Sequence, residues 1–285
     1  MTEAEDDLRF NERYGRFEKT IKITEKRGKD GKQSRRQTKT TPRLVPGVMP
    51  QLFARHLIER TTFLGLDEIT DHLPEMREET IHVEMDPKLK KAYVEVEEKL
   101  TDAVRMLLAQ RNSKLLSKML ITLLGYPDHP YGWGEIGWTD DDGRFIKVCE
   151  PKELAKDFQY AKEKAIVAEC LKERKSWVYA VMTGKRDVVG RLAERMTAAG
   201  LKVAVLRSEV PTTDREEWIA ANAPKSDVLI SHPQLVETGL DFFDNNPRTY
   251  NIPTIMFAQT GYALYTLRQA AGRHFRIGQD QPCRT

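Results

Sequence analysis

The sequence predicts an α/β fold in its second half, preceded by a mostly helical segment. Beyond Ala165, short apolar runs alternate with amphipathic helices, which is typical of a parallel sheet built from strand-helix-strand units. Between Val48 and about Pro130, apolar residues instead recur every three or four positions, as on the buried stripe of a helix. We therefore expect three regions, namely a basic arm or hairpin, a helical segment with a connector, and the sheet domain, at 1–47, 48–150 and 151–285.

The elements of the sheet domain follow from its apolar runs. Strands are expected at 177–182, 202–206, 227–231 and 253–258. Helices are expected at 187–199, at 213–221 behind a capping box, and from about residue 262 onward. Ligands of parallel sheets collect at the carboxyl ends of the strands, so a site is expected in the loops after Met182, Ser231 and Ala258.

The helical segment has one clear start. Asp86 can cap a helix and Pro87 suits its first position, after which apolar residues follow at helical spacing as far as Leu107. A short helical stretch is expected earlier, at 49–59, and a second apolar helix at 115–124. The stretch 132–144 is rich in glycine, aspartate and tryptophan, which favours a connecting loop.

Composition sets looser limits. The chain has 285 residues, 40% hydrophobic content and a formal charge of +3, which permits a nucleic-acid partner without requiring one. Its cysteines, Cys149, Cys170 and Cys283, form no C-x-x-C pair, and its histidines show no metal spacing. The acidic N-terminus is unlike a signal peptide, and no apolar run approaches the roughly 18 residues of a membrane span. We expect an intracellular, cytoplasmic protein without a membrane partner.

Positive charge is concentrated at 18–43, with ten basic and three acidic residues. Turn residues in the middle of this stretch could join two short strands, at 21–24 and 37–41. Two interpretations stay open. The arm either is solvated without specific contacts or binds a nucleic-acid phosphate backbone.

The most informative stretch is QAAGRHFRIGQ, at 269–279. It places Gln269, Arg273 and Arg276 at positions i, i+4 and i+7, which share one face if the stretch is helical. An arginine is always charged and has five donors in a rigid fork, so this face suits a phosphoanion. His274, between the two arginines, could contact a nucleotide, although a core or surface role is the default for a histidine.

The pattern Q-x-x-G-R-x-x-R-I-G-Q resembles the last conserved motif of superfamily-two helicases of the Swi/Snf-like type. The stretch LVETGLDF, at 235–242, resembles the helicase motif that contacts both nucleotide and nucleic acid. The resemblance implies nucleotide contacts for Gln269, Gly239 and Asp241, and a nucleic-acid contact for Thr238. His232-Pro233-Gln234-Leu235 stands where these proteins usually have a glycine-rich stretch, which leaves the strand contacts there undefined.

After the first strand, the family has a hydroxyl residue that contacts phosphate, so Thr183 and Lys185 are candidates for binding the nucleic-acid backbone. The alternative is an ordinary strand-to-helix turn. The earlier part of the chain resembles the tail of a first motor lobe at the following positions: Arg60, Leu73, Pro74, Glu78 and Tyr93. LVETGLDF, the segment Gln259-Thr260-Gly261-Tyr262, YTLRQA and RIGQ together resemble helicase-related proteins of phages and bacterial mobile elements. The whole resemblance covers roughly 48–281.

The resemblance therefore implies a RecA-like C-terminal lobe with Arg273 and Arg276 as catalytic arginine fingers. No G-x-x-x-x-G-K-[ST] loop is present, and FLGLDE, at 63–68, is better interpreted as a loop with an exposed acidic pair than as a magnesium-binding strand. ATP and Mg²⁺ would be held mainly by an N-terminal RecA-like lobe, in the same or another chain. We expect part of an ATP-dependent DNA helicase or translocase that acts on double-stranded DNA and is inactive alone. The alternative is a non-catalytic module that binds nucleic acid or protein.

Overall fold

The computed structural model describes most of the chain. The described residues are 3–18, 21–27, 33–39, 42–62, 64–70, 73–140, 142–236, 240, 242–243 and 249–285. Contacts between backbones divide them into two compact units, Met1–Ile69 and Thr70–Thr285.

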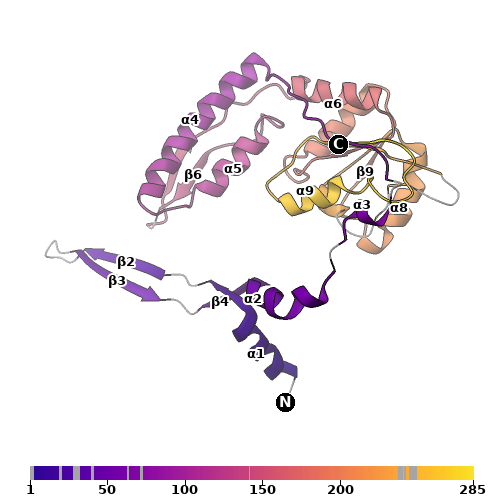
Figure 1. The fold of residues 1–285 in the computed structure, drawn as a ribbon. Coiled ribbons are helices and arrows are strands. Elements are labelled where there is room, and N and C mark those ends of the chain that lie inside the picture. Colours follow the sequence, from indigo (N-terminus) through magenta and orange to yellow (C-terminus); the bar gives the residue numbers. More distant parts are fainter. Residues whose placement is uncertain are drawn as a thin grey trace. The chain divides into compact units, whose positions relative to one another are not determined.

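The first unit consists of short helices and two separate strand pairs (Figure 1). Its elements are α1 (Glu3–Tyr14), β1 (Gly15–Glu18), β2 (Ile21–Arg27), β3 (Gln33–Lys39), β4 (Arg43–Val48), α2 (Pro50–Leu52), η1 (Phe53–Leu57), η2 (Ile58–Arg60) and α3 (Leu66–Ile69). Strands β1 and β4 pair in antiparallel fashion, as do β2 and β3. The two strands expected at 21–24 and 37–41 correspond to β2 and β3, whereas the turn expected between them, at 28–32, lies outside the described residues. The predicted helical stretch at 49–59 is present as α2, η1 and η2.

The second unit contains a parallel sheet with strand order β5-β12-β11-β8-β10-β9. Its strands are β5 (Met76–Arg77), β8 (Ser176–Tyr179), β9 (Val203–Leu206), β10 (Val228–Ser231), β11 (Thr254–Phe257) and β12 (Cys283–Arg284). The central strands β8 and β10 are buried along their whole length. This is the parallel α/β sheet that the sequence predicts, and buried strands of this kind read as continuous apolar runs.

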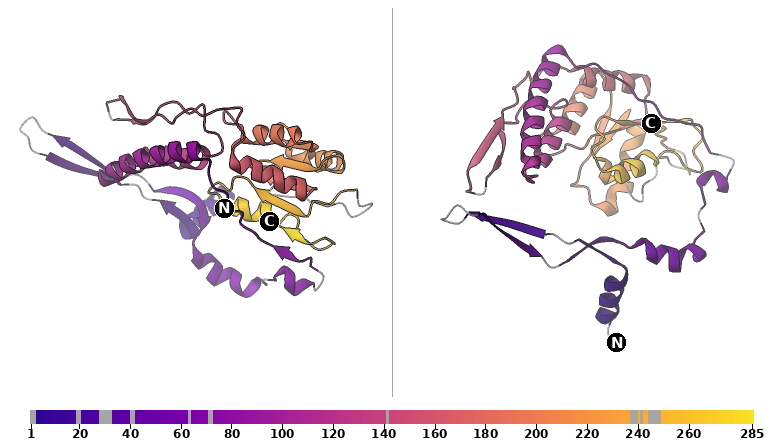
Figure 2. Two further views of the ribbon diagram at one scale, coloured as in Figure 1. Left: turned by 90° about the horizontal axis from the view of Figure 1, so that it is seen from above. Right: turned by 60° about the vertical axis from the view of Figure 1, so that its left-hand side comes forward.

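Helices cover both faces of this sheet (Figure 2). They are α6 (Ala161–Lys172), α7 (Val188–Ala198), α8 (Arg215–Asn222), α9 (Leu264–Ala271) and the short η3 (Thr212–Asp214), η4 (Ala223–Lys225) and η5 (Pro233–Leu235). Because side chains alternate along a strand, Trp177 and Tyr179 of β8 pack with α8 and α9, whereas Val178 packs with α6 and α7. The domain is thus a three-layer sandwich.

The helical segment precedes the sheet domain in sequence and has a core of its own. Helices α4 (Pro87–Ala109) and α5 (Leu116–Gly125) lie side by side (Figures 1 and 2). The predicted stripe is confirmed, since the buried residues of α4 recur at spacings of three and four. They are Leu89, Ala92, Val96, Leu100, Val104 and Leu107. Asp86 stands at the start of α4 as predicted, but its carboxylate accepts a hydrogen bond from the backbone N–H of Ala161, at the start of α6.

Three local predictions were wrong. The stretch expected to be a connecting loop contains strand β6 (Ile136–Thr139), which pairs with β7 (Phe145–Cys149), and Trp133 and Ile136 belong to the core. The capping box expected at Thr213 does not form, because α8 begins only at Arg215 and its N-cap makes no side-chain bond. The last helix begins at Leu264 and ends at Ala271, earlier than the motif requires.

Candidate nucleotide and nucleic-acid site

The carboxyl ends of three neighbouring strands meet at one level of the sheet. The register pairs Tyr179 of β8 with Ser231 of β10 on one side and with Phe257 of β11 on the other. The loops that follow these strands therefore lie next to one another, at the edge where parallel sheets bind ligands. These are the loops in which the sequence predicts a site.

Gln259 holds two of these loops together. Its Oε1 accepts hydrogen bonds from the backbone N–H groups of Val181, at 3.0 Å, and Met182, at 3.1 Å. Its Nε2 donates to Oδ2 of Asp128, at 2.8 Å, and the Asp128 carboxylate also forms an ion pair with Lys162. Gln259 thus connects β11, β8 and the connector from the helical segment. Sequence reasoning assigned it no role, although a polar residue directly after a buried strand was a usable signal.

The turn after β11 depends on Gly261. Its φ is +66°, a left-handed conformation that favours glycine. A Cβ at this position would also lie 3.3 Å from Cγ1 of Val181. A side chain at residue 261 would therefore press on Val181 of the β8 loop, and glycine avoids this contact.

The β8 loop contains the two predicted phosphate contacts. Thr183 and Lys185 are both exposed there, at the predicted edge of the sheet. The loop ends at Asp187, whose carboxylate caps α7 by accepting from the N–H of Gly190 and pairs with both terminal nitrogens of Arg207. Burial raises the pKa of Asp187, but the bonds from Arg207 and Gly190 outweigh it and leave the pKa below the ordinary value. The anchored end of the loop fixes where its exposed part lies.

Sequence reasoning missed a cation-π contact in the same loop. The guanidinium of Arg186 lies 3.6 Å from the ring centroid of Trp133, whose Nε1 donates to the carbonyl of His129. Burial lowers the pKa of Arg186, and its Nε has no hydrogen-bond partner among the described residues. This stacking attaches the helical segment to the β8 loop. No local pattern predicts it, because the two residues belong to different elements.

The shared helical face predicted for Gln269, Arg273 and Arg276 does not form. Gln269 is exposed in the last turn of α9, but the helix is capped by Gly272, and both arginines follow its end. Glycine is a poor helix former, which explains why the helix ends there. The motif residues are neighbours in sequence across a helix end rather than along one helical stripe.

The two arginines have different surroundings. Arg273 is only 5% exposed, and its Nη1 donates to the carbonyl of Leu240, at 3.3 Å. It thereby connects the motif to the loop after β10. Arg276 is half-buried and follows three residues later. His274, between them, is fully buried, and burial lowers its pKa to about 4.

The remaining predicted residues, Thr238, Gly239 and Asp241, lie outside the described residues. Their neighbours Leu240 and Phe242 are buried in the core beneath β8 and α9, and Phe242 stacks on Trp177 with 4.3 Å between ring centroids. Gln279, the last residue of the motif, exchanges hydrogen bonds with the side chain of Asn251. The segment after α9 is thus tied at both ends to the stretch between β10 and β11.

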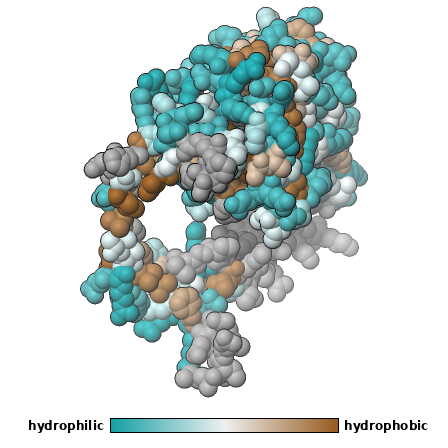
Figure 3. Space-filling view, turned by 90° about the vertical axis from the view of Figure 1, so that its right-hand side faces the viewer, coloured by the Kyte–Doolittle hydropathy of each residue, from teal (hydrophilic) through white to brown (hydrophobic). Residues whose placement is uncertain are grey.

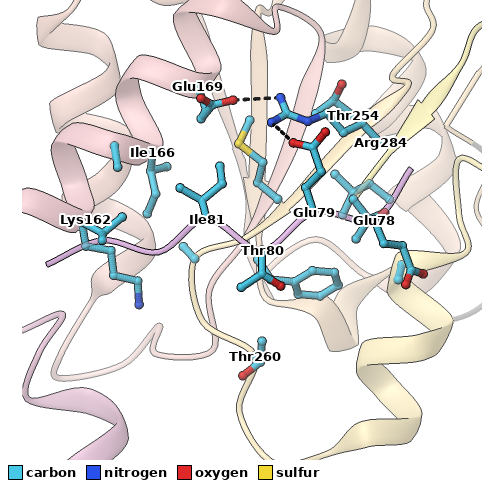
Figure 4. Close-up of a pocket in the computed structure, with 18 of the residues that line it drawn as sticks. Glu78, Glu79, Thr80, Ile81, Lys162, Ile166, Glu169, Thr254, Thr260 and Arg284 are labelled. Carbon is cyan, nitrogen blue, oxygen red and sulfur yellow. Dashed lines mark hydrogen bonds and ion pairs between the residues drawn. The ribbon is translucent and has the colours of Figure 1, made fainter. Parts of the chain in front are cut away.

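A pocket of about 600 Å³ lies elsewhere, between the 78–83 segment, α6, β11 and α9 (Figure 4). Of the predicted site residues that the structure describes, none lines it. Arg284 bonds to both Glu79 and Glu169 at 2.8 Å, and the charged side chains of Glu78 and Lys162 also line the pocket. Apart from threonines, the rest of its lining is apolar, and the motif residues remain the candidate site.

No protein-family model matches the sequence, and no curated protein matches it. The fold, however, resembles that of solved structures. The crystal structure of the C-terminal part of the Fun30 ATPase domain has a TM-score of 0.53 and 16% identity, over 75% of this chain and 84% of that one. The SWI2/SNF2 ATPase core of Sulfolobus solfataricus, solved in complex with double-stranded DNA, has a TM-score of 0.51 and 15% identity, over 75% of this chain and 41% of that one.

The chain has the fold of a Swi/Snf-like C-terminal lobe. The RecA-like sheet flanked by helices is therefore confirmed. The chain spans 41% of the length of the Sulfolobus core. Among its described residues, no group of three or more His, Cys, Asp or Glu could hold a metal ion, and no helix is long and apolar enough to cross a membrane. On the face shown in Figure 3, hydrophilic residues predominate and hydrophobic ones form narrow patches.

Proposed function

We propose that this chain is the C-terminal part of an ATP-dependent DNA helicase or translocase. In this proposal it supplies arginine fingers and DNA contacts to a nucleotide site that an N-terminal RecA-like lobe completes. The observation that carries the proposal is the helicase motif at 269–279 on a lobe with this fold. The double-stranded DNA in the Sulfolobus complex supports duplex DNA as the partner.

The surroundings of the two arginines suggest different roles. Arg276, which is half-buried and beyond the helix end, is the better candidate to reach a phosphoryl group on another lobe. Arg273 is buried against the Leu240 carbonyl, so we infer that it holds the two motif segments in register. Gln269, exposed on α9, would contact the nucleotide, together with Gly239 and Asp241.

The cofactors would be ATP and Mg²⁺. Gln269, Arg273 and Arg276 donate from amide and guanidinium groups, which suit phosphate oxygens, and the carboxylate of Asp241 would contact the nucleotide sugar. The magnesium ligands would therefore come from the other lobe. Thr183, Lys185 and Thr238 would contact the DNA backbone, since hydroxyl and ammonium groups are common phosphate ligands.

The decisive experiment replaces Arg276 with alanine in the motor that contains both lobes. We expect DNA-stimulated ATP turnover to fall by about 10³ to 10⁵, as for arginine fingers in other NTPases, while binding of a non-hydrolysable ATP analogue is unchanged. Arg268→Ala is the matched control, because Arg268 is an exposed arginine of α9 just before the motif. Near-normal turnover by the Arg276→Ala motor would contradict the assignment.

Arg273→Ala should lower turnover by another route. Loss of the Arg273 guanidinium leaves the buried Leu240 carbonyl without this donor, so the free energy of unfolding should fall by about 1 to 3 kcal/mol. Unchanged stability would mean that Arg273 does not position the motif. The alternative function, a module that binds without turnover, predicts that adding a first lobe produces no DNA-stimulated hydrolysis at all.

A further inference from the structure

The basic arm has a property that its composition does not reveal. Strands β2 and β3 form a two-stranded antiparallel ribbon with a continuous register from Ile21↔Lys39 to Arg27↔Gln33 (Figure 1). In such a ribbon, paired residues belong to the same face, and the faces alternate along each strand. The register therefore sorts the residues of the arm into two sets.

One set is uniform in character. It consists of Lys22, Thr24, Lys26, Ser34, Arg36 and Thr38. It has three cations and three hydroxyl residues, with no acidic and no apolar residue. The other set is mixed and contains isoleucine, glutamate and glutamine beside its basic residues. Its members are Ile21, Ile23, Glu25, Arg27, Gln33, Arg35, Gln37 and Lys39.

We propose that the face of the ribbon with Lys22, Lys26 and Arg36 binds the phosphate backbone of duplex DNA. Lysine, arginine, serine and threonine are the side chains that most often contact phosphate and sugar. Residues of one face follow each other at about 7 Å along a strand, so positions 22 and 26 are about 14 Å apart along β2. A two-stranded ribbon is also narrow enough for the major groove, which is about 12 Å wide.

Charge complementarity decides among the polyanions that could occupy this face. A membrane surface would favour apolar residues beside the cations, and this face has none. The inference does not rest on the proposed function, since DNA binding by the arm needs neither ATP nor another lobe. It concerns the first unit of the chain, whereas the motif residues lie in the second.

The test compares two triple variants of the full chain that remove the same charge. One is Lys22→Gln, Lys26→Gln and Arg36→Gln, and the control is Arg27→Gln, Arg35→Gln and Lys39→Gln on the other face. Affinity for a fluorescent duplex is measured without ATP between 50 and 200 mM salt. The salt slope is the slope of the logarithm of the binding constant against the logarithm of the salt concentration. Three lost phosphate contacts should make this slope less steep by about 2.7. From 50 to 200 mM salt, the affinity of the unchanged chain should therefore fall by a factor about 40 times larger than that of the first variant.

The control variant should keep a slope near that of the unchanged chain. An equal decrease of the salt slope in both variants would overturn the proposal, because the two faces would then contribute equally to DNA binding. Binding of the first face to phosphatidylserine vesicles but not to the duplex would also overturn it. An isolated ribbon is marginally stable, so a second triple variant separates loss of charge from loss of folding. It is Lys22→Arg, Lys26→Arg and Arg36→Lys, which keeps all three charges. Its affinity should depend on salt as strongly as that of the unchanged chain.

Discussion

The amide of Gln259 lies 2.8 Å from the carboxylate of Asp128, which is 131 residues away in the sequence. This bond joins the loop after β11 to the connector that leads from the helical segment. The same side chain accepts from two backbone N–H groups of the β8 loop. The predicted site loops therefore have a shared support that is not itself part of the helicase motif.

Gln259→Ala should lower the free energy of unfolding of the chain by about 2 to 4 kcal/mol. The substitution leaves two N–H groups without an acceptor in a part-buried position, and each such loss costs about 1 to 3 kcal/mol. Urea unfolding measures the change. Gln234→Ala, at an exposed glutamine of η5, should stay within about 0.5 kcal/mol. A loss below 1 kcal/mol for Gln259→Ala would mean that other groups hold the two loops together.

The strands of the sheet domain were predictable because their signal is local. Strands β8 and β10 are buried on both faces, so every residue in them must suit the core, and their sequences read as continuous apolar runs. The helix at 187–199 was equally clear, because Asp187 caps it and Gly200 follows it. Features of this kind are determined by residues that are close together in the sequence.

The errors concern residues whose partners are distant in sequence. Trp133 lies in a stretch of turn residues, yet it belongs to the core of the helical segment and stacks on Arg186, a residue of another element. The i, i+4, i+7 spacing at 269–276 assumed a helix that continues, but Gly272 ends it. Spacing alone could not distinguish the exposed Gln269 from the buried Arg273, because Arg273 donates to the carbonyl of Leu240, which is distant in sequence.

Gly261→Ala should destabilise the loop after β11 by about 1 to 2 kcal/mol, the cost of a left-handed conformation for a residue with a side chain. The added Cβ would also press on Val181, at 3.3 Å. Gly184→Ala is the matched control, since a Cβ there meets nothing within 4 Å and φ is not positive. Thermal unfolding of both variants checks this, and equal melting temperatures would contradict it.

Arg191 and Glu163 form a buried ion pair between α7 and α6. Arg191 also donates to the carbonyls of Lys156, at 2.6 Å, and Phe158, at 2.7 Å. Arg191→Met should cost about 3 to 5 kcal/mol, because it leaves the Glu163 carboxylate buried and unpaired.

Arg191→Met combined with Glu163→Leu should cost less than the sum of the two single changes, since no unpaired charge then remains. Urea unfolding of the three variants gives the coupling energy. Additive losses would show that the two side chains contribute independently.

The buried imidazole of His274 should make stability depend on pH. Burial lowers the folded-state pKa to about 4, whereas an unfolded histidine has its ordinary pKa of 6.5. The unfolded chain therefore binds a proton that the folded chain excludes, and stability falls as the pH decreases from about 6.5 to about 4. Between pH 7 and pH 5 the expected loss is about 2 kcal/mol. Urea unfolding at several pH values compares wild type with His274→Gln, in which this part of the pH dependence should vanish. Identical pH dependence in the two proteins would show that the imidazole titrates normally and is not held neutral in the core.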